Sequence, residues 1–190
     1  MAMDAGAVLG FWFGDPPATE PRAEWFRKDA AFDAQIRERF GATLDAALQG
    51  GLRDWDSTPQ GALARIVVLD QFTRNAFRDT PGAFAGDALA LAAAQALVAS
   101  GADRALGAWQ RQFVYLPFEH AEDLAMQDES VRLFTRLHAE TQGFAGSLDY
   151  AQRHRAIIER FGRFPHRNAI LDRPSTAEER AFLQQPGSSF

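Results

Sequence analysis

Apolar residues recur at helical spacing in the first third of the chain. Between residues 29 and 51 they follow one another at intervals of four, at Phe32, Ile36, Phe40, Leu44 and Leu48. This spacing places them on one face of an amphipathic helix. Asp29 can cap the start of that helix, and Gly50 with Gly51 can end it. A short helix at 8–13 and a helical turn at 25–26, both rich in aromatic residues, are expected before it.

Two further helices are predicted between residues 58 and 101. Residues 58 and 59, Thr-Pro, are a helix start signal, and residues 62–69 are almost entirely apolar, which indicates a buried central helix. β-Branched residues at 66–68 leave a buried strand as the alternative, but the length of the run and its alanine-rich flanks favour a helix. An alanine-rich helix follows, with Asp87 as its expected cap and Gly101 as its stop.

The second half of the chain continues the helical pattern. Residues 109–115 are predicted to be helical up to a break at Pro117. Residues 118–141 then form one long helix, or two helices joined near residues 127–128. Another helix is expected over residues 147–162, from a serine cap to a glycine stop.

In all, the pattern predicts an all-α fold. A capping box at residues 175–179 starts a last helix, which brings the expected number to seven to nine, with no strand. The connections are short, so neighbouring helices should pack as antiparallel hairpins. Residues 1–190 are expected to form a single all-helical domain with loose ends at 1–6 and 185–190.

Composition narrows the classes of function. The formal net charge of -5 argues against a nucleic-acid-binding surface, which needs a broad basic face. No apolar run is long enough to suggest a membrane span, and the N-terminus lacks the basic residues of a secretory signal. The chain has no cysteine, which fits a cytoplasmic location and excludes thiolate metal sites. Lys28 is the only lysine, so anion contacts would be made almost entirely by arginine.

Three clusters of polar residues interrupt the apolar pattern. The first follows the buried central helix and contains Asp70, Gln71, Arg74, Asn75 and Arg78. The second comes after the predicted break and contains Glu119, His120, Asp123 and Gln127, with the two acids and the glutamine at intervals of four. The third combines the helix at 147–162 with a basic loop and contains His154, Arg163, His166, Arg167 and Asn168.

Our first hypothesis is that these clusters line a pocket for a small anionic ligand, either a carboxylate or a phosphate compound. Arginine forks bind such groups, and the arginines assigned to the pocket are Arg74, Arg78, Arg163 and Arg167. His120 and His166 titrate near neutral pH and are the candidate proton-transfer groups. Glu119 and Asp123 would orient them or act as a general base. The sequence leaves open whether the chain is an enzyme.

A structural interpretation of the same clusters stays open. Arg74 and Arg78 would pair with Glu119 and Asp123 in a buried ion network that fixes helix packing. His154, which keeps core spacing, would be a core histidine. On this interpretation the clusters bind nothing.

A third hypothesis is a helical scaffold that binds a peptide or a protein partner in a groove. Exposed aromatic residues would support it, and the candidates are Trp25, Trp55 and Trp109. A metal site is disfavoured, because the spacing EHAED differs from HExxH and the nearby arginines oppose a cation. We therefore expect neither a metal nor a cofactor.

Four segments together resemble a bacterial family, the domain of unknown function 924. They are FWFG at 11–14, LDQFTRN at 69–75, PFEHAEDLAMQ at 117–127 and RFGRFPHRNAILDR at 160–173. The resemblance runs from Val8 to Leu183 and implies a tetratricopeptide-like array of packed helical hairpins, but no activity. Its signature segments hold most of the polar residues named above. Asp172 departs from the family pattern, in which glycine is expected.

Overall fold

The structure, a computed structural model, describes residues 2–189. Its α-helices are α1 (Ala5–Phe13), α2 (Ala30–Leu48), α3 (Pro59–Ile66), α4 (Thr73–Ala76), α5 (Asp87–Ala99), α6 (Ala108–Glu119), α7 (Leu124–Glu140), α8 (Ala145–Phe161) and α9 (Ala177–Leu183). Short 3-10 turns join them: η1 (Ala23–Trp25), η2 (Arg53–Ser57), η4 (Pro81–Phe84), η5 (Ala102–Ala105) and η6 (Pro165–Arg167). A π-helical segment, η3 (Val67–Phe72), lies between α3 and α4. The all-α prediction is confirmed, and the strand alternative for residues 62–69 is wrong.

Most predicted helix ends are where the capping residues indicated. The Asp29 carboxylate accepts hydrogen bonds from the first amides of α2, and the Thr58 hydroxyl caps α3. Thr176 and Glu179 form the capping box of α9. Gly162 follows α8 with φ 68°, in the left-handed region that glycine adopts without strain.

The junction of α6 and α7 differs from the prediction. Pro117 lies inside α6, which continues to Glu119, and α7 begins only at Leu124. Pro117 removes one helical hydrogen bond, the one to the carbonyl four residues earlier, but the helix continues for two residues beyond it. Asp123 caps α7 by accepting a hydrogen bond from the Met126 amide at 3.0 Å. The expected single stripe through residues 119, 123 and 127 is therefore wrong.

Two other helix starts were also mispredicted. The N-cap of α5 is Gly86, and Asp87 is the first helical residue, which leaves its carboxylate free for other contacts. α8 starts at Ala145 instead of Ser147, and the Ser147 hydroxyl donates to the Gln112 side chain at 2.7 Å. Both errors come from residues that can cap a helix but are engaged by a tertiary partner instead.

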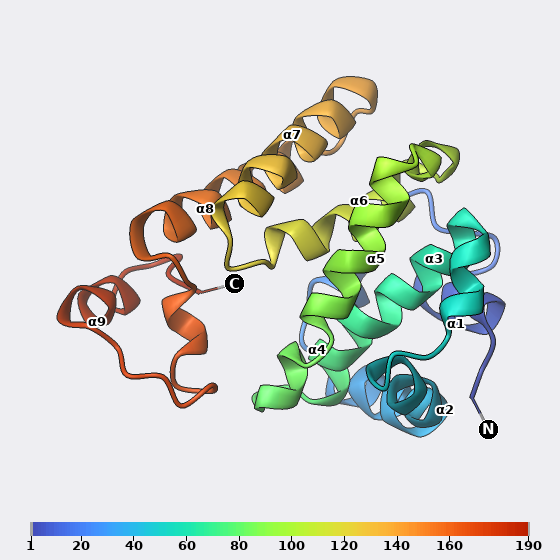
Figure 1. The fold of residues 1–190 in the computed structure, drawn as a ribbon, viewed down its shortest axis with the longest axis horizontal. Helices are drawn as coiled ribbons and strands as arrows, with labels where there is room; N and C mark the ends of the chain where they lie inside the picture. Colours follow the sequence, from blue (N-terminus) through green and yellow to red (C-terminus); the bar gives the residue numbers. More distant parts are fainter. Residues whose placement is uncertain (1, 190) are drawn as a thin grey trace.

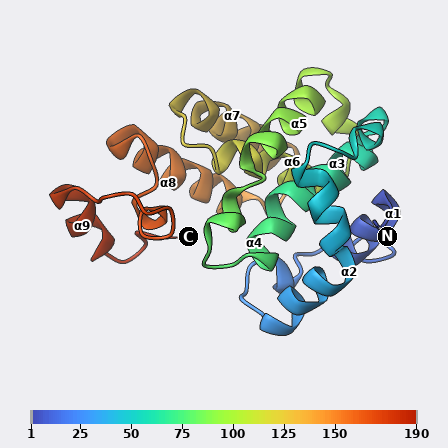
Figure 2. The same ribbon diagram turned by 60° about the horizontal axis from the view of Figure 1, so that its bottom comes forward.

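The central helix is α3 with its π-helical continuation. Leu63, Ile66, Val67, Val68, Leu69 and Phe72 are all fully buried there. α3 packs against α1, α5 and α6, and the π segment packs against α2 and α5. Figure 1 and Figure 2 show this helix within the ring of its neighbours. Burial on all sides explains why residues 62–69 are almost entirely apolar.

The C-terminal part is arranged differently. α6, α7 and α8 are joined by short loops and pack as consecutive antiparallel hairpins. In both views α9 lies at the end of the molecule opposite to α1 and α2 (Figures 1 and 2). A second, small apolar cluster holds this end together, formed by Ile157, Ile158, Phe161, Phe164 and Phe182. The remaining contacts of this end with the rest of the chain are largely polar, as described below.

Residues 81–99, which include α5, have the length and hydropathy of a membrane-spanning helix. Ala90, Ala94 and Leu97 of this stretch are buried against the core. At the chain ends, α1 already includes Ala5, within the expected loose segment 1–6. Met1 and Phe190, which belong to the two expected loose ends, lie outside the described residues.

Candidate functional site

The π-helical segment carries the buried acid at the centre of the site. A π turn inserts an extra residue into a helix, and such segments are common at functional sites. Asp70 lies in this turn and is 0% exposed. Its carboxylate faces Gln71, which donates from Nε2, and Arg74, whose Nη1 is 3.1 Å from Oδ1. Burial raises the pKa of Asp70, but the charge of Arg74, together with the hydrogen bonds from His120 and Gln71, brings the pKa below its ordinary value.

His120 is the residue that Asp70 orients. It caps the C-terminal end of α6, and its Nδ1 lies 2.7 Å from Asp70 Oδ1. Because the carboxylate is charged, Nδ1 carries the proton, and Nε2 is left with the free lone pair. Burial and the charge of Arg74 lower the pKa of His120, against a smaller opposite effect of Asp70. The lowered pKa favours the neutral imidazole over the imidazolium.

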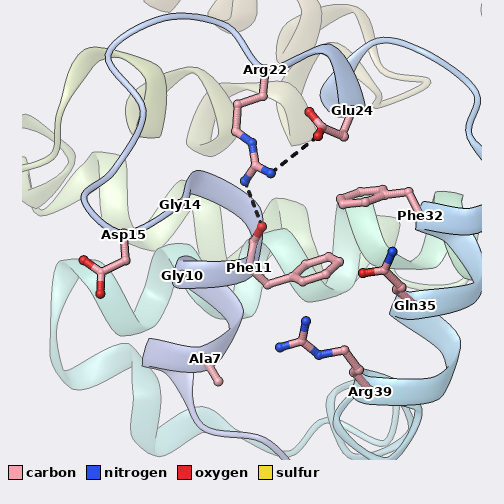
Figure 3. A pocket seen from close by; sticks show the side chains of 10 residues that line it. All are labelled: Ala7, Gly10, Phe11, Gly14, Asp15, Arg22, Glu24, Phe32, Gln35 and Arg39. Atoms are coloured by element: carbon pink, nitrogen blue, oxygen red, sulfur yellow. Dashed lines mark hydrogen bonds and ion pairs between the residues drawn. The ribbon is translucent and has the colours of Figure 1, made fainter.

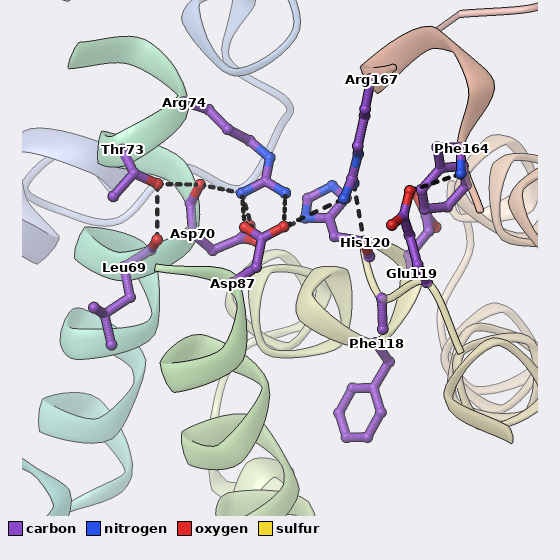
Figure 4. Close-up of polar contacts among 12 residues, drawn as sticks. Leu69, Asp70, Thr73, Arg74, Asp87, Phe118, Glu119, His120, Phe164 and Arg167 are labelled. Carbon is purple, nitrogen blue, oxygen red and sulfur yellow. Dashed lines mark hydrogen bonds and ion pairs between the residues drawn. The ribbon is translucent and has the colours of Figure 1, made fainter. Parts of the chain in front are cut away.

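Two arginines converge on Asp87 at the start of α5 (Figure 4). Arg74 binds it with both Nη atoms, at 2.8 and 3.1 Å. Arg167 comes from η6 and approaches the same carboxylate at 3.4 Å, while its Nη2 donates to the His120 carbonyl at 3.0 Å. Arg74 thus binds both carboxylate oxygens of Asp87, whereas Arg167 makes only one longer contact with this carboxylate.

Arg167 is a buried cation with unused hydrogen-bonding capacity. Its side chain is 8% exposed, and its guanidinium lies between the rings of Phe84 and Phe164, at 4.7 and 4.6 Å from their centroids. Its Nε has no hydrogen-bond partner among the described residues. Burial, followed by the repulsion of Arg74, lowers its pKa to about 10. Aromatic stacking holds the group in place, and Nη1, which is 3.4 Å from Asp87, can donate to a closer partner.

Glu119 and His154 form a second buried acid–histidine pair behind His120. Glu119 Oε1 lies 3.5 Å from His154 Nδ1, which itself contacts the Tyr150 carbonyl at 2.9 Å. Burial, followed by the charge of Asp70, raises the pKa of Glu119 to about 8. Burial lowers the pKa of His154 to about 3. Both groups are therefore neutral at pH 7, which suits their apolar surroundings.

A cleft of about 480 Å³ opens in front of this network. It is lined by Pro81, Phe84, Ala85, Asp87, Ala88, Leu91, Pro117, His120, Ala121, Glu122, Asp123, Arg167 and Leu171. Its walls are mostly apolar, and a few polar groups converge on it, as in small-molecule sites. Among the described residues, no group of three or more acids and histidines is placed to hold a metal ion.

A second hollow, of about 560 Å³, lies between α1 and α2 (Figure 3). The stacked rings of Phe11 and Phe32 line it, and Arg39 lies over the Phe11 ring at 4.9 Å. Arg39 is exposed, and Arg22 at the other end is bound to the carbonyls of Phe11 and Trp12. No buried, underused polar group points into this hollow from the described residues, so the cleft at His120 is the better candidate site.

Comparison with known proteins places the chain in a family. The family described as bacterial protein of unknown function (DUF924) matches residues 8–187. The chain belongs to the DUF924 family. It is similar to a solved structure of a protein of unknown function from Agrobacterium tumefaciens, with 41% identity and a TM-score of 0.84 over 95% of this chain and 96% of that one. No match was found among curated proteins.

The DUF924 protein brings together only some of the predicted site residues. Asp70, Arg74, His120 and Arg167 belong to one network, of which His120 and Arg167 line the cleft, with Asp123 at its edge. The expected pairing of Arg74 and Arg78 with Glu119 and Asp123 is wrong. Arg74 pairs with Asp70 and Asp87, and Arg78 binds both oxygens of Asp33 at 2.8 and 2.9 Å. The orientation of His120 by Glu119 or Asp123 is also wrong, because Asp70 makes that contact.

The other predicted residues have structural partners away from the cleft. Asn75 donates to Asp33, and Arg163 binds Glu179 at 2.6 and 2.8 Å. Asn168 contacts Arg173 and Ser175. Gln127 is fully buried and donates to the carbonyls of Glu119 and Ala121, which ties α7 to the end of α6. Gln71 donates to Asp70.

His166 stands apart from His120. It is half-buried in η6, beside the Phe164 ring at 5.6 Å, and is not among the described residues that line the cleft. Burial, followed by the charge of Arg167, lowers its pKa to about 4. Since the imidazole stays neutral down to acidic pH, it is a weak base for chemistry near neutrality.

Sequence reasoning missed Asp87, Phe84 and Glu122 as site residues of the DUF924 protein. Asp87 was assigned to a helix cap, and Phe84 precedes α5 with no polar neighbour to mark it. Glu122 binds Arg173 at 2.6 and 2.9 Å and accepts from the Phe164 amide at 2.7 Å. In the sequence, Glu122 could have been recognised as a site residue only by its position within the family segment 117–127.

Proposed function

We propose that the cleft binds a small molecule with a carboxylate or phosphate group, and that His120 transfers a proton to or from this molecule. The observation that carries the proposal is the 2.7 Å contact between Asp70 and His120 at the base of a cleft lined by Arg167. A buried carboxylate that fixes one imidazole nitrogen and leaves the other facing a ligand is the arrangement of a general base.

The proton transfer follows from this geometry. Asp70 holds the proton on Nδ1, so Nε2 is the nitrogen that takes a proton from a ligand in the cleft. The imidazolium that forms is stabilised by the charge of Asp70, whose pKa stays low. Return of the proton from Nε2 to the product restores the neutral ring. Which bond of the ligand changes depends on its identity.

Arg167 supports binding of the anionic group. Its one carboxylate contact within residues 2–189 is the 3.4 Å approach to Asp87, which is itself bound by Arg74 at shorter distances. A ligand carboxylate or phosphate oxygen offers Arg167 a shorter, charge-assisted hydrogen bond than it has now. The Phe84 and Phe164 rings keep the guanidinium plane fixed, so little order must be gained on binding.

The scaffold hypothesis finds less support. Trp25 is 8% exposed, and Trp55 and Trp109 are partly buried against the core. The large apolar residues that are exposed among the described residues are Phe26, Leu124 and Tyr150. They do not form the aromatic groove that a peptide partner would use, so we favour a small ligand over a protein partner.

The test is a titration of the protein with inorganic phosphate, acetate and succinate, followed through the ring nitrogens of His120 by NMR. We expect a saturable shift of the His120 signals with at least one of these anions. Arg167→Lys should weaken that binding about tenfold, because an ammonium cannot reproduce the planar fork. The control is Arg160→Lys, an exposed arginine paired with Glu178, which should bind as the parent does. If no anion moves His120, or if both variants bind equally, the proposal is wrong.

A further inference from the structure

The charges around the cleft point to one class of ligand. We infer that the ligand is a zwitterion, an amino carboxylate whose carboxylate binds Arg167 and whose amine faces Asp123. This inference rests on the proposed function, since it assigns the anion to the same arginine. It adds a second charged contact and therefore a substrate class.

Three carboxylates line the cleft, and two of them are already neutralised. Asp87 is bound by both Nη atoms of Arg74. Glu122 is bound by two nitrogens of Arg173 and also accepts the Phe164 amide. Neither has a free charge to offer a ligand. The cation of a ligand therefore has to find its counter-ion elsewhere in the cleft.

Asp123 is the acid with capacity left. Its Oδ1 accepts the Met126 amide at the start of α7, at 3.0 Å, and it makes no ion pair within residues 2–189. Its side chain is exposed at the edge of the cleft. A carboxylate that uses one oxygen for a cap can use the other for a cation. An amine in the cleft would find its counter-ion here.

Arg167 is the matching cation, because it lines the cleft and its Nη1 contact with Asp87 is long, at 3.4 Å. Apolar residues also line this cleft, among them Phe84, Leu91, Pro117 and Leu171. A ligand with a short apolar part and two opposite charges matches this set of groups. An alkanoate would bind Arg167 through its carboxylate but would have no cation to pair with Asp123.

The experiment compares two series of probes of matched length. One series consists of straight-chain ω-amino acids from glycine upward, and the other of the alkanoic acids with the same number of carbons. Affinity is measured by calorimetry, and the His120 ring signals report that binding occurs in the cleft. We expect the amino acid of best length to bind about fivefold more tightly than its alkanoate partner, as one partly exposed ion pair contributes about 1 kcal/mol.

Asp123→Asn tests the assignment of the amine site. Asparagine caps a helix about as well as aspartate, so α7 should keep its start while the charge is lost. In this variant the preference for the amino acid over the alkanoate should disappear. Asp29→Asn is the matched control, since Asp29 caps α2 in the same way but lies outside the cleft. That variant should keep the preference.

The outcomes separate the two proposals. If alkanoates and amino acids bind equally well to the parent protein, the zwitterion is wrong while anion binding at Arg167 stands. If the preference survives in Asp123→Asn, the amine is bound elsewhere and the inference is overturned. If no member of either series binds, and the anions of the first titration also leave His120 unmoved, both proposals fail together.

Discussion

At the scale of single residues, the site depends on which carboxylate faces His120. Glu119 is its neighbour in sequence, and the sequence favoured Glu119 or Asp123 as the orienting group. Adjacent residues at a helix end point in different directions, so Glu119 turns to His154 instead. Asp70, fifty residues away, makes the contact. The sequence marked both Asp70 and His120 as site residues, but no local spacing could pair them.

Asp70→Asn should lower the pKa of His120 further. Burial and Arg74 already lower this pKa, and the charge of Asp70 opposes them. Asparagine keeps the shape and an oxygen that can accept from Nδ1, but it removes the charge that favours the imidazolium. The measurement is a pH titration of the His120 ring nitrogens by NMR in both proteins.

The control for this titration is Asp103→Asn. Asp103 is as buried as Asp70, but its partners are Tyr115 and Arg136. This variant should leave the pKa of His120 where it is in the parent. An unchanged His120 pKa in Asp70→Asn would mean that the 2.7 Å contact carries no electrostatic coupling, which would remove the basis of the general-base proposal.

At the scale of elements, the sequence predicted the helices well and their junctions less well. Periodicity and capping residues located α2, α3 and α9 because these signals are local. The α6–α7 junction was misplaced because Pro117 resembles a breaker, whereas the actual break follows from the cap at Asp123. The π turn at residues 67–72 has no periodic signal, since an apolar run looks the same in either helix type.

Glycine at position 86 is what lets α5 approach the π turn. A Cβ at this position would overlap with the carbonyl oxygen of Leu69, which also accepts from the Thr73 hydroxyl at 2.8 Å. The close approach brings Asp87, the next residue, to Arg74. A small residue in one element thus positions a charged pair between two elements.

Gly86→Ala should therefore destabilise the protein and disturb the site. We expect a loss of about 2 kcal/mol or more in the free energy of unfolding, because backbone must move to relieve the overlap. The His120 ring signals should shift as Asp87 and Arg74 separate. Urea unfolding and the NMR spectrum of the folded state measure these two effects.

Gly10→Ala is the matched control for this change. Gly10 lies inside α1, and a Cβ there has no neighbour within 4 Å. Alanine is the better helix former by about 1 kcal/mol, so this variant should be as stable as the parent or slightly more so. Equal stability of the two variants would show that the contact between residues 86 and 69 is not tight.

At the scale of the whole molecule, the site depends on contacts that no local pattern encodes. Arg167 reaches Asp87 across eighty positions of sequence, and Arg173 reaches Glu122 across fifty-one. These ion pairs join the C-terminal end, with its own small apolar cluster, to the edge of the cleft. The sequence predicted that the basic stretch would lie near the second cluster. Which arginine does so could not be predicted, and Arg163 turns instead to Glu179 in α9.

At position 172 the glycine of the family pattern indicates a left-handed backbone conformation. The resemblance implied glycine at this position, and the structure places Asp172 at φ 51°, in the left-handed region. Aspartate tolerates this conformation better than most residues, which reconciles the departure with the fold. The turn is therefore kept although the glycine is not.

The stability of the whole molecule should depend on pH through Glu119. Its pKa is about 8 in the folded protein against an ordinary value of 4.5, because burial favours the neutral acid. Between these values the folded state holds a proton that the unfolded state releases. The contribution of Glu119 is therefore fully present below about pH 4.5 and is lost as the pH rises towards 8, by about 1.4 kcal/mol per pH unit. His154, with its pKa lowered to about 3, acts in the opposite sense as the pH falls below 6.5.

Glu119→Gln isolates this effect, because glutamine stays neutral at every pH while His154 titrates in both proteins. We expect the variant to gain stability over the parent progressively from pH 5 to pH 8. Urea unfolding at unit intervals of pH measures the difference, and Glu20→Gln, at an exposed position, should give none. A difference that stays flat across this range would mean that Glu119 is ionised in the folded protein. The negative charge would then add to that of Asp70, and the neutral state of the Glu119–His154 pair behind His120 would have to be abandoned.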